Sequence, residues 1–110
     1  MHQLTFILAR REDLTPDDFA AWLLGRHVEL VRQVAASTGK IVSYRVALAP
    51  VGLDGSPSDF DAVTQITAAT AADGDAIVAE LIRVGTPADS AAHTSRRIPL
   101  RLDLQDIICA

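Results

Sequence analysis

The sequence is poor in cysteine, in aromatic residues and in long apolar runs. Its single cysteine, Cys109, excludes an intramolecular disulfide and a zinc site built from cysteines. Aromatic residues make up only 5% of the chain while hydrophobic residues make up 49%, so any core must consist mainly of aliphatic side chains. No apolar run approaches the length of a helix that spans a bilayer, and we therefore expect no membrane partner.

Charge and chain length narrow the class of protein further. The formal net charge of −4 argues against binding to a nucleic-acid backbone, which requires a clustered basic face. The apolar residues 4–9 follow no basic stretch and end at the charged residues 10–13, so we do not expect a signal peptide. We expect a cytoplasmic protein whose 110 residues form one domain, residues 1–110.

Hydrophobic patterning predicts a strand and a long helix in the first half of the chain. Residues 4–10 are apolar on both faces, which is typical of a strand that is covered on both sides. Thr15 is suited to cap a helix that begins at Pro16 and runs to about Ala36, and Gly39 then provides a C-terminal stop. The apolar stripe of this helix is expected to contain Phe19, Leu23, Leu30 and Val34, with Trp22 and Val31 at its edges.

The second half of the chain alternates between strand and helix patterns. Strands are predicted over residues 41–48, 60–68 and 100–108, a second helix over residues 73–84, and a helical turn followed by a loop over residues 88–97. The order strand-helix-strand-strand-helix-strand defines the ferredoxin-like βαββαβ arrangement, an α+β fold with a four-stranded antiparallel sheet. Right-handed crossovers place two helices on one face of that sheet.

The other face of the predicted sheet has no helix to cover it. Residues 4–9 carry apolar side chains at both odd and even positions, which point to opposite faces of a strand, so part of this uncovered face is hydrophobic. An exposed apolar patch on a small protein indicates a partner surface, and two copies related by a two-fold axis would cover it. We therefore expect a homodimer that forms through the sheet face.

Several segments of the chain resemble the EthD-like family. Residues 6–19 resemble the opening of these proteins, in which a strand ends in basic residues and is followed by a turn and a Leu-Ser/Thr-x-x-x-Phe motif. Trp22 and residues 26–31 resemble the family's helix, where an aromatic residue precedes a histidine and an apolar pair. Residues 60–63 are similar to the start of its third strand, and residues 102–108 to its closing strand.

The resemblance implies a dimeric α+β barrel, in which two ferredoxin-like chains pack their sheets together. In the wider superfamily a pocket between helices and sheet serves monooxygenases, polyketide cyclases, decarboxylases, isomerases and haem enzymes, so the fold does not fix the chemistry. The family often carries a glutamate and further aromatic residues along the third strand. This chain has Thr-Gln-Ile-Thr at residues 64–67, so neither group is available there.

His27 is the first candidate for a catalytic residue. It lies within the apolar stripe of the first helix, and the resemblance places the family's histidine at this position. An imidazole titrates near neutral pH and can act as a general acid or base. Asp61 and Asp106 are candidates for a carboxylate that orients the ring. The alternative is a core histidine that bonds to a backbone carbonyl or to a neighbouring acid.

Three further side chains are candidates for substrate binding. Tyr44 can donate a hydrogen bond to a substrate carbonyl, or it can cover apolar neighbours as an aromatic residue of an edge strand. Trp22 can present a flat surface to a ligand or pack in the core. Gln65 lies on the third strand, where a polar group either lines a wet cavity or is satisfied across a dimer interface. The arginine pairs 10–11 and 96–97 are solvated strand ends or binding groups for a substrate carboxylate.

The sequence predicts no resident metal or cofactor. His2, His27 and His93 are far apart and lack the spacing of metal ligands. No segment resembles a glycine-rich phosphate loop or a nucleophile elbow. A haem with His27 as its axial ligand is a further alternative.

Two functions from different classes fit these observations. One is a cofactor-independent enzyme (a cyclase, isomerase, decarboxylase or monooxygenase-like protein) that uses His27 for proton transfer on an apolar or aromatic carbonyl compound. The other is a non-catalytic dimeric protein that binds a small apolar ligand or assists a degradation or tailoring pathway. A fully packed space between helices and sheet, with His27 bonded only to backbone, would favour the second function.

Overall fold

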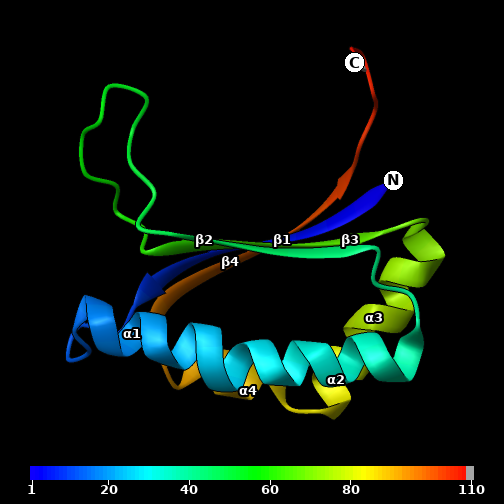
Figure 1. Ribbon diagram of the computed structural model, residues 1–110, viewed down its shortest axis with the longest axis horizontal. Helices are drawn as coiled ribbons and strands as arrows, with labels where there is room; N and C mark the ends of the chain where they lie inside the picture. The colour runs from blue at the N-terminus through cyan, green and yellow to red at the C-terminus, as the bar shows by residue number, and fades with distance from the viewer. Residues whose placement is uncertain (109–110) are drawn as a thin grey trace.

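The chain folds into an antiparallel sheet that is covered on one face by helices (Figure 1). The computed structural model describes residues 1–108, and Cys109 lies outside them. In chain order the elements are β1 (His2–Arg10), α1 (Pro16–Trp22), η1 (Leu23–His27), α2 (Val28–Thr38), β2 (Ser43–Leu48), β3 (Ala62–Ala68), α3 (Ala71–Arg83), α4 (Thr86–Ala91) and β4 (Thr94–Asp103).

The strand order confirms the predicted ferredoxin-like arrangement. Within residues 1–108 the sheet has four strands in the order β2-β3-β1-β4, and every neighbouring pair is antiparallel. Leu4 of β1 faces Ile66 of β3 and Arg101 of β4 across the ladder. The central strands β1 and β3 therefore carry the inner wall of the core, and β2 and β4 form the edges.

The first helical segment starts at the predicted Pro16 and is terminated by the predicted Gly39. The Thr15 hydroxyl accepts a hydrogen bond from the Asp18 N–H at 3.1 Å, and Pro16 occupies the first turn. At the other end Gly39 has a φ of 63°, a left-handed conformation that glycine adopts without steric cost. The helical segment thus extends to Thr38, two residues beyond the predicted Ala36.

A π-helical turn, η1, interrupts this helical segment and rotates its buried face. The N–H of Val28 bonds to the carbonyl of Leu23, a spacing of one residue more than in an α-helix. As a result Val31 is buried and Leu30 is only half-buried, whereas the α-helical pattern predicts the reverse. The same turn brings His27 to the buried side at its last position.

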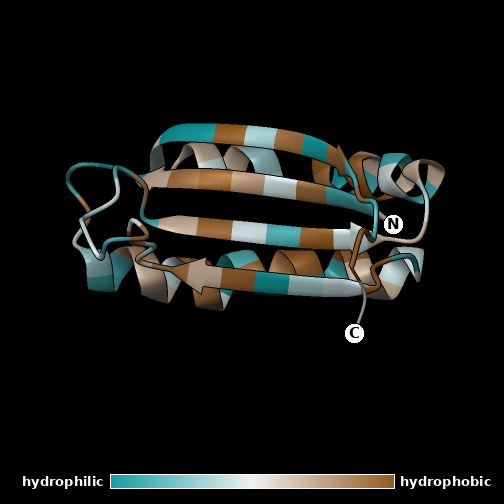
Figure 2. Cartoon of the chain, turned by 90° about the horizontal axis from the view of Figure 1, so that it is seen from above, coloured by the Kyte–Doolittle hydropathy of each residue, from teal (hydrophilic) through white to brown (hydrophobic). Residues whose placement is uncertain are grey.

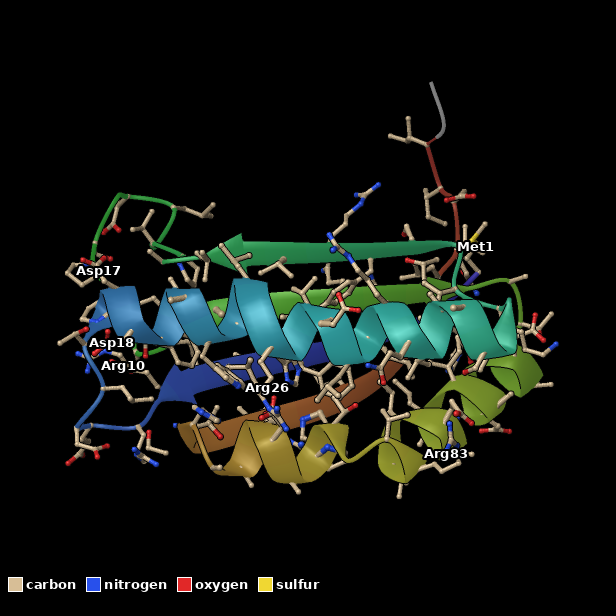
Figure 3. All side chains as sticks on the ribbon, turned by 60° about the horizontal axis from the view of Figure 1, so that its bottom comes forward. Met1, Arg10, Asp17, Asp18, Arg26 and Arg83 are labelled. Carbon is tan, nitrogen blue, oxygen red and sulfur yellow. The ribbon has the colours of Figure 1, made fainter. Side chains whose placement is uncertain are left out.

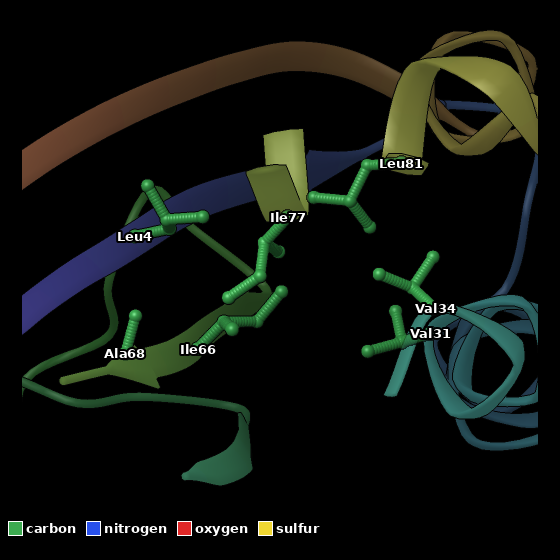
Figure 4. Packing of buried hydrophobic residues seen from close by; sticks show 7 residues of the cluster. All are labelled: Leu4, Val31, Val34, Ile66, Ala68, Ile77 and Leu81. Carbon is green, nitrogen blue, oxygen red and sulfur yellow. The ribbon is translucent and has the colours of Figure 1, made fainter. Parts of the chain in front are cut away.

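The core consists of two clusters between helices and sheet. In the larger one, aliphatic side chains of α2 and α3 meet those of β1 and β3 (Figure 4), and its buried members are Leu4, Val31, Val34, Ile66, Ala68, Ile77 and Leu81. The smaller one joins α1 and η1 to the strands and contains Leu8, Phe19, Trp22, Leu23 and Ala62. Phe6 of β1 packs against both clusters, so the two meet along the middle of β1.

The region after α3 departs from the sequence prediction. Residues 88–97 do not form a turn and a loop; α4 is a short helix, and β4 starts at Thr94 rather than at residue 100. Gly85 makes the bend between α3 and α4 with a φ of 86°. Pro99 and the arginines of β4 break the apolar alternation, and a proline is tolerated because β4 is an edge strand. A third helical element therefore joins the predicted two on the same face of the sheet.

The opposite face of the sheet is not covered by any helix of residues 1–108 (Figure 1). Seen from above, hydrophobic and hydrophilic positions alternate along its strands (Figure 2). The loop between β2 and β3 and the segment after β4 rise on this side. None of the helices described is long and apolar enough to cross a membrane, and the cytoplasmic location stays a prediction.

Candidate functional site

A cavity of about 290 Å³ lies between the helices and the sheet, where the two core clusters meet. This volume is at the lower end of the range for small-molecule pockets. Its wall is largely aliphatic and includes Leu4, Leu8, Val31, Ile66 and Leu81. Seven residues bring polar groups to it, namely His27, Tyr44, Thr64, Thr86, Ser90, Arg97 and Arg101. The site is thus a small apolar cavity with a few polar groups on its wall.

His27 borders this cavity and is held by a carboxylate of α4. Its side chain is buried, and Nδ1 lies 3.1 Å from Oδ2 of Asp89. An ionised carboxylate only accepts hydrogen bonds, so Nδ1 carries the proton and donates it to Asp89. Nε2 is then the unprotonated nitrogen of the neutral ring and is the atom that can accept a proton.

Asp89 receives hydrogen bonds from three side chains of the first helical segment. Besides His27, the indole Nε1 of Trp22 donates to Oδ2 and the guanidinium Nε of Arg26 donates to Oδ1, each at 3.0 Å. Arg26 reaches across from the helix to α4 (Figure 3). The rings of His93 and Trp22 are stacked, with their centroids 4.4 Å apart, and Nδ1 of His93 donates a hydrogen bond to the backbone carbonyl of Asp89. These bonds fix the carboxylate and, through it, the orientation of the His27 ring.

The surroundings of the pair keep the histidine neutral and the aspartate ionised. Burial lowers the pKa of His27 below its ordinary 6.5; the hydrogen bond and the charge of Asp89 oppose this effect, and Arg97 and His93 add to it. Burial raises the pKa of Asp89, but the hydrogen bonds from His27, Arg26 and Trp22 outweigh it, so that its pKa is lowered. At neutral pH the pair is therefore an imidazole beside a carboxylate, which is the arrangement of a general base and its orienting acid.

Two buried hydroxyl groups at the cavity wall have no hydrogen-bond partner within residues 1–108. They are Oη of Tyr44, which comes from β2, and Oγ1 of Thr86, which comes from the first turn of α4. Burial also raises the pKa of Tyr44 to about 12, so its hydroxyl stays protonated and can donate. Buried polar groups normally have partners, and a ligand with oxygen atoms would supply them here.

The two aspartates that the sequence suggested as orienting carboxylates do not contact His27. Asp61 lies at the end of the sheet, where Oδ2 accepts a hydrogen bond from the backbone N–H of Arg10 at 2.8 Å. Asp106 is exposed in the segment that follows the end of β4. The carboxylate beside His27 comes instead from α4, an element that the sequence pattern did not resolve.

Two of the predicted substrate-binding residues are also placed elsewhere. Trp22 is buried behind His27, with its ring 4.9 Å from the imidazole and its indole N–H bound to Asp89, and it does not line the cavity. Gln65 lies on the uncovered face of the sheet, because Thr64 and Ile66 on either side of it point to the cavity. Of these three candidates only Tyr44 lines the cavity.

Asp89 is the candidate site residue that sequence reasoning missed. A signal for it exists: Thr86 and Pro87 follow Gly85 and open a helix, and an acid in the first turn of a helix is typical of such a start. The identity of its partner has no local signal, because α4 meets η1 only in the folded chain. Among residues 1–108 no cluster of three or more His, Cys, Asp or Glu side chains is arranged to hold a metal ion.

The fold and the site together define an α+β protein of the ferredoxin-like class with a cavity between helices and sheet. A family model described as the EthD domain matches residues 11–83, and the chain belongs to the EthD family. The matched segment includes His27 and Tyr44, whereas Asp89 and Arg97 lie beyond it. Among curated protein sequences none matches the chain significantly.

Solved structures share this fold over nearly the whole chain. An ethyl tert-butyl ether D (EthD) family protein from Bacillus halodurans has a TM-score of 0.76 at 15% identity, covering 96% of this chain and 99% of its own. A dimeric ferredoxin-like protein of unknown function from Bacteroides fragilis has a TM-score of 0.65 at 13% identity, with coverage of 94% and 95%. A hydroxynitrile lyase from Passiflora edulis has a TM-score of 0.67 at 6% identity, with coverage of 98% and 96%.

Proposed function

We propose that this EthD-family protein is a cofactor-independent enzyme that transfers a proton on a small apolar or aromatic carbonyl compound. The observation that carries the proposal is a neutral His27, held by Asp89, at the wall of an apolar cavity. Burial disfavours the charged form of His27, and the fixed carboxylate behind the ring offsets part of this cost, so that the ring can take up a proton during the reaction. Isomerisation through an enolate and aldol-type cyclisation both begin with such a step.

The proposed reaction moves one proton from the substrate to His27 and back, and needs no other reactant. Nε2 of His27 takes the proton from a carbon next to the substrate carbonyl, and the C–H electron pair moves into the enolate. Asp89 stabilises the imidazolium that results, as a buried carboxylate does in other His–Asp pairs. The Tyr44 hydroxyl, which is protonated and without a partner in the described chain, donates to the enolate oxygen. The imidazolium then returns the proton to the substrate, and no oxidant or cofactor is consumed.

The structural comparisons are compatible with an enzyme. The hydroxynitrile lyase from Passiflora edulis shows that this fold serves as a catalyst of small-molecule chemistry in at least one protein. At 6% identity the likeness concerns the fold, and the chemistry proposed for this chain rests on His27 and Asp89.

The experiment that tests this function follows exchange of hydrogen for deuterium in a probe ketone. The α-protons of 2-tetralone are monitored by NMR in D₂O with the wild-type protein, with His27→Gln and without protein. We expect exchange above the buffer rate with the wild type and exchange at the buffer rate with His27→Gln. Glu29→Gln, an exposed change on the same helical segment, is the matched control and should exchange like the wild type. Equal rates for wild type and His27→Gln would overturn the proposed role.

The alternative is a binding protein without catalysis, and the apolar wall of the cavity favours it. Its expected result is binding of the probe ketone, measured by calorimetry, with no exchange above the buffer rate. An accessory protein without a ligand would have a fully packed space between helices and sheet and a His27 bonded only to backbone. This chain has a cavity there, and His27 bonds to the side chain of Asp89.

We further propose that two single-domain copies pair through the uncovered sheet face to form a dimeric α+β barrel. This face carries apolar side chains, and Leu102 on β4 is 38% exposed there, opposite Gln3 of β1. The loop between β2 and β3 and the segment after β4 rise beside the same face and would border the second copy (Figure 1). The ferredoxin-like protein from Bacteroides fragilis, which shares this fold, is dimeric.

A further inference from the structure

Strand β4 places two arginines on the helix side of the sheet and one on the other side. Arg97 is paired with Leu8 and Arg101 with Leu4 in the ladder, and both arginines line the cavity. Arg96 directly precedes Arg97 and is paired with Ala9. Its guanidinium lies over the ring of Phe60, 5.3 Å from the ring centroid. Adjacent residues of a strand point to opposite faces, so only Arg97 of the pair 96–97 belongs to the cavity.

The charges around the cavity are balanced except at Arg97. Arg101 forms an ion pair with Asp75, and Arg26 forms one with Asp89. Within residues 1–108 no carboxylate lies within ion-pair distance, 4.0 Å, of the Arg97 guanidinium. Arg97 is nevertheless partly buried beside a largely aliphatic wall. A cation in such a place lacks both full hydration and a counter-charge, and an anionic ligand would supply the latter.

Arg97 also acts on the histidine of the pair. Arg97 and His27 line the same cavity, and the positive charge of Arg97 is among the influences that lower the pKa of His27. The other groups that affect His27 are Asp89, which opposes Arg97, and His93, which acts in the same direction. An anion bound by Arg97 would therefore lie in the same cavity as the reacting carbon.

We propose that Arg97 binds the carboxylate of the substrate, so that the substrate class is apolar or aromatic carboxylic acids. This inference rests on the proposed function only for where the reacting carbon lies; the binding of the carboxylate does not depend on it. The planar guanidinium offers paired N–H donors that match the two oxygens of a carboxylate. The aliphatic wall around it contacts the apolar part of the molecule, and the Tyr44 and Thr86 hydroxyls remain for other oxygens.

A carboxylate bound at Arg97 would also change the basicity of His27. A carboxylate bound at Arg97 compensates the positive charge that disfavours protonation of His27. The basicity of His27 then rises when such a substrate is bound, and an uncharged analogue leaves it unchanged. Arg97 would thus couple the recognition of an acid to the strength of the base.

The test compares two ligands of equal shape and different charge, 2-naphthoate and 2-naphthamide. Their dissociation constants are measured by calorimetry at pH 7.5 with the wild type and with Arg97→Gln. The matched control comes from the same strand: Arg96→Gln removes an arginine on the other face of the sheet. The NMR titration of His27 with and without naphthoate is a second readout.

We expect the wild type to bind naphthoate about tenfold or more tightly than naphthamide, as charge-assisted hydrogen bonds give. Arg97→Gln should remove this preference by weakening the binding of naphthoate alone, and Arg96→Gln should keep it. Naphthoate should also raise the pKa of His27 in the wild type. The proposal is overturned if Arg97→Gln keeps the preference, or if the wild type shows none. Because binding is measured without turnover, loss of the catalytic proposal in the exchange experiment would not alter this result.

Discussion

Nδ1 of His27 donates a hydrogen bond of 3.1 Å to Oδ2 of Asp89, a residue 62 positions further along the chain. The π turn η1 supplies the histidine and α4 supplies the carboxylate, and Trp22 and Arg26 hold the carboxylate from its other sides. The pair combines a base that is neutral at pH 7 with an acid that is ionised. The other nitrogen of the ring, Nε2, is the one available to a molecule in the cavity that His27 lines.

Replacing Asp89 by asparagine should lower the pKa of His27 further. Asp89 is the group that raises it against burial, through both its hydrogen bond and its charge. NMR titration of the imidazole signals measures the change. Asp75→Asn, which removes an exposed carboxylate paired with Arg101, is the matched control and should leave the titration of His27 unaltered. A His27 pKa that rises or stays constant in Asp89→Asn would contradict the assignment of the pair.

The stability of the protein should fall as the pH drops through the range just below 6.5. His27 has a lower pKa in the folded protein than the 6.5 of an unperturbed histidine, so in this range the unfolded chain binds more protons. The free energy of unfolding therefore rises with pH between the folded pKa and 6.5 and levels off above it. Urea unfolding of the wild type and of His27→Gln at several pH values measures this slope. The slope should be smaller in His27→Gln; an identical slope in the two proteins would refute the role of His27.

Replacing Tyr44 by phenylalanine should not destabilise the fold. The buried Tyr44 hydroxyl has no partner among the described residues, so its removal is expected to leave the free energy of unfolding unchanged or to raise it by about 1 kcal/mol. Exchange of the probe ketone should slow down in the same variant, because the donor to the enolate oxygen is lost. Unfolding in urea and the exchange assay measure the two effects. A marked loss of stability would show that the hydroxyl has a structural partner instead.

Two isoleucines of α3 should respond very differently to truncation. Ile77 is fully buried in the larger core cluster, whereas Ile82 is 62% exposed. Ile77→Ala is expected to cost about 2–5 kcal/mol of unfolding free energy, because it leaves a cavity in the core. Ile82→Ala should change stability by about 0.5 kcal/mol or less. Thermal or urea unfolding of the two variants checks this, and similar losses for both would mean that α3 packs in another rotation.

The oligomeric state should depend on the uncovered sheet face. We expect light scattering to give a dimer for the wild type and a monomer for Leu102→Glu, since a charge is costly in an apolar interface. Leu24→Glu is the matched control, because Leu24 is 54% exposed but belongs to η1 on the helix side. A monomeric wild type, or a dimer that survives in Leu102→Glu and dissociates in Leu24→Glu, would exclude the sheet-face dimer.

Local signals in the sequence were sufficient for most of the elements. Thr15, Pro16 and Gly39 marked the ends of the first helical segment, because caps and stops depend on a residue's own backbone and side chain. The pattern of residues 60–68 predicted a strand, and the structure has β3 at Ala62–Ala68 with every second residue buried. The order of these elements led to the ferredoxin-like arrangement, which the topology and the family match confirm.

The π turn η1 and strand β4 could not be predicted from such local signals. A π turn adds one residue to a helical turn without a clear sequence signature, so Leu30 was expected in the core in place of Val31. Strand β4 carries Arg96, Arg97 and Pro99, which hid its strand pattern. Only its pairing with β1 makes it a strand, and the predicted strand over residues 100–108 was displaced for that reason.

The sequence by itself determined the elements, their order, the histidine on the buried side of the first helix and the tyrosine on the second strand. The tertiary structure alone decided what surrounds them: Asp89 rather than Asp61 or Asp106 beside His27, and Arg97 at the cavity. The reason is physical. Helix ends and strand faces follow from interactions within a few residues, whereas the partner of a buried side chain depends on how α4 and β4 pack against η1 and β1, which no local pattern records.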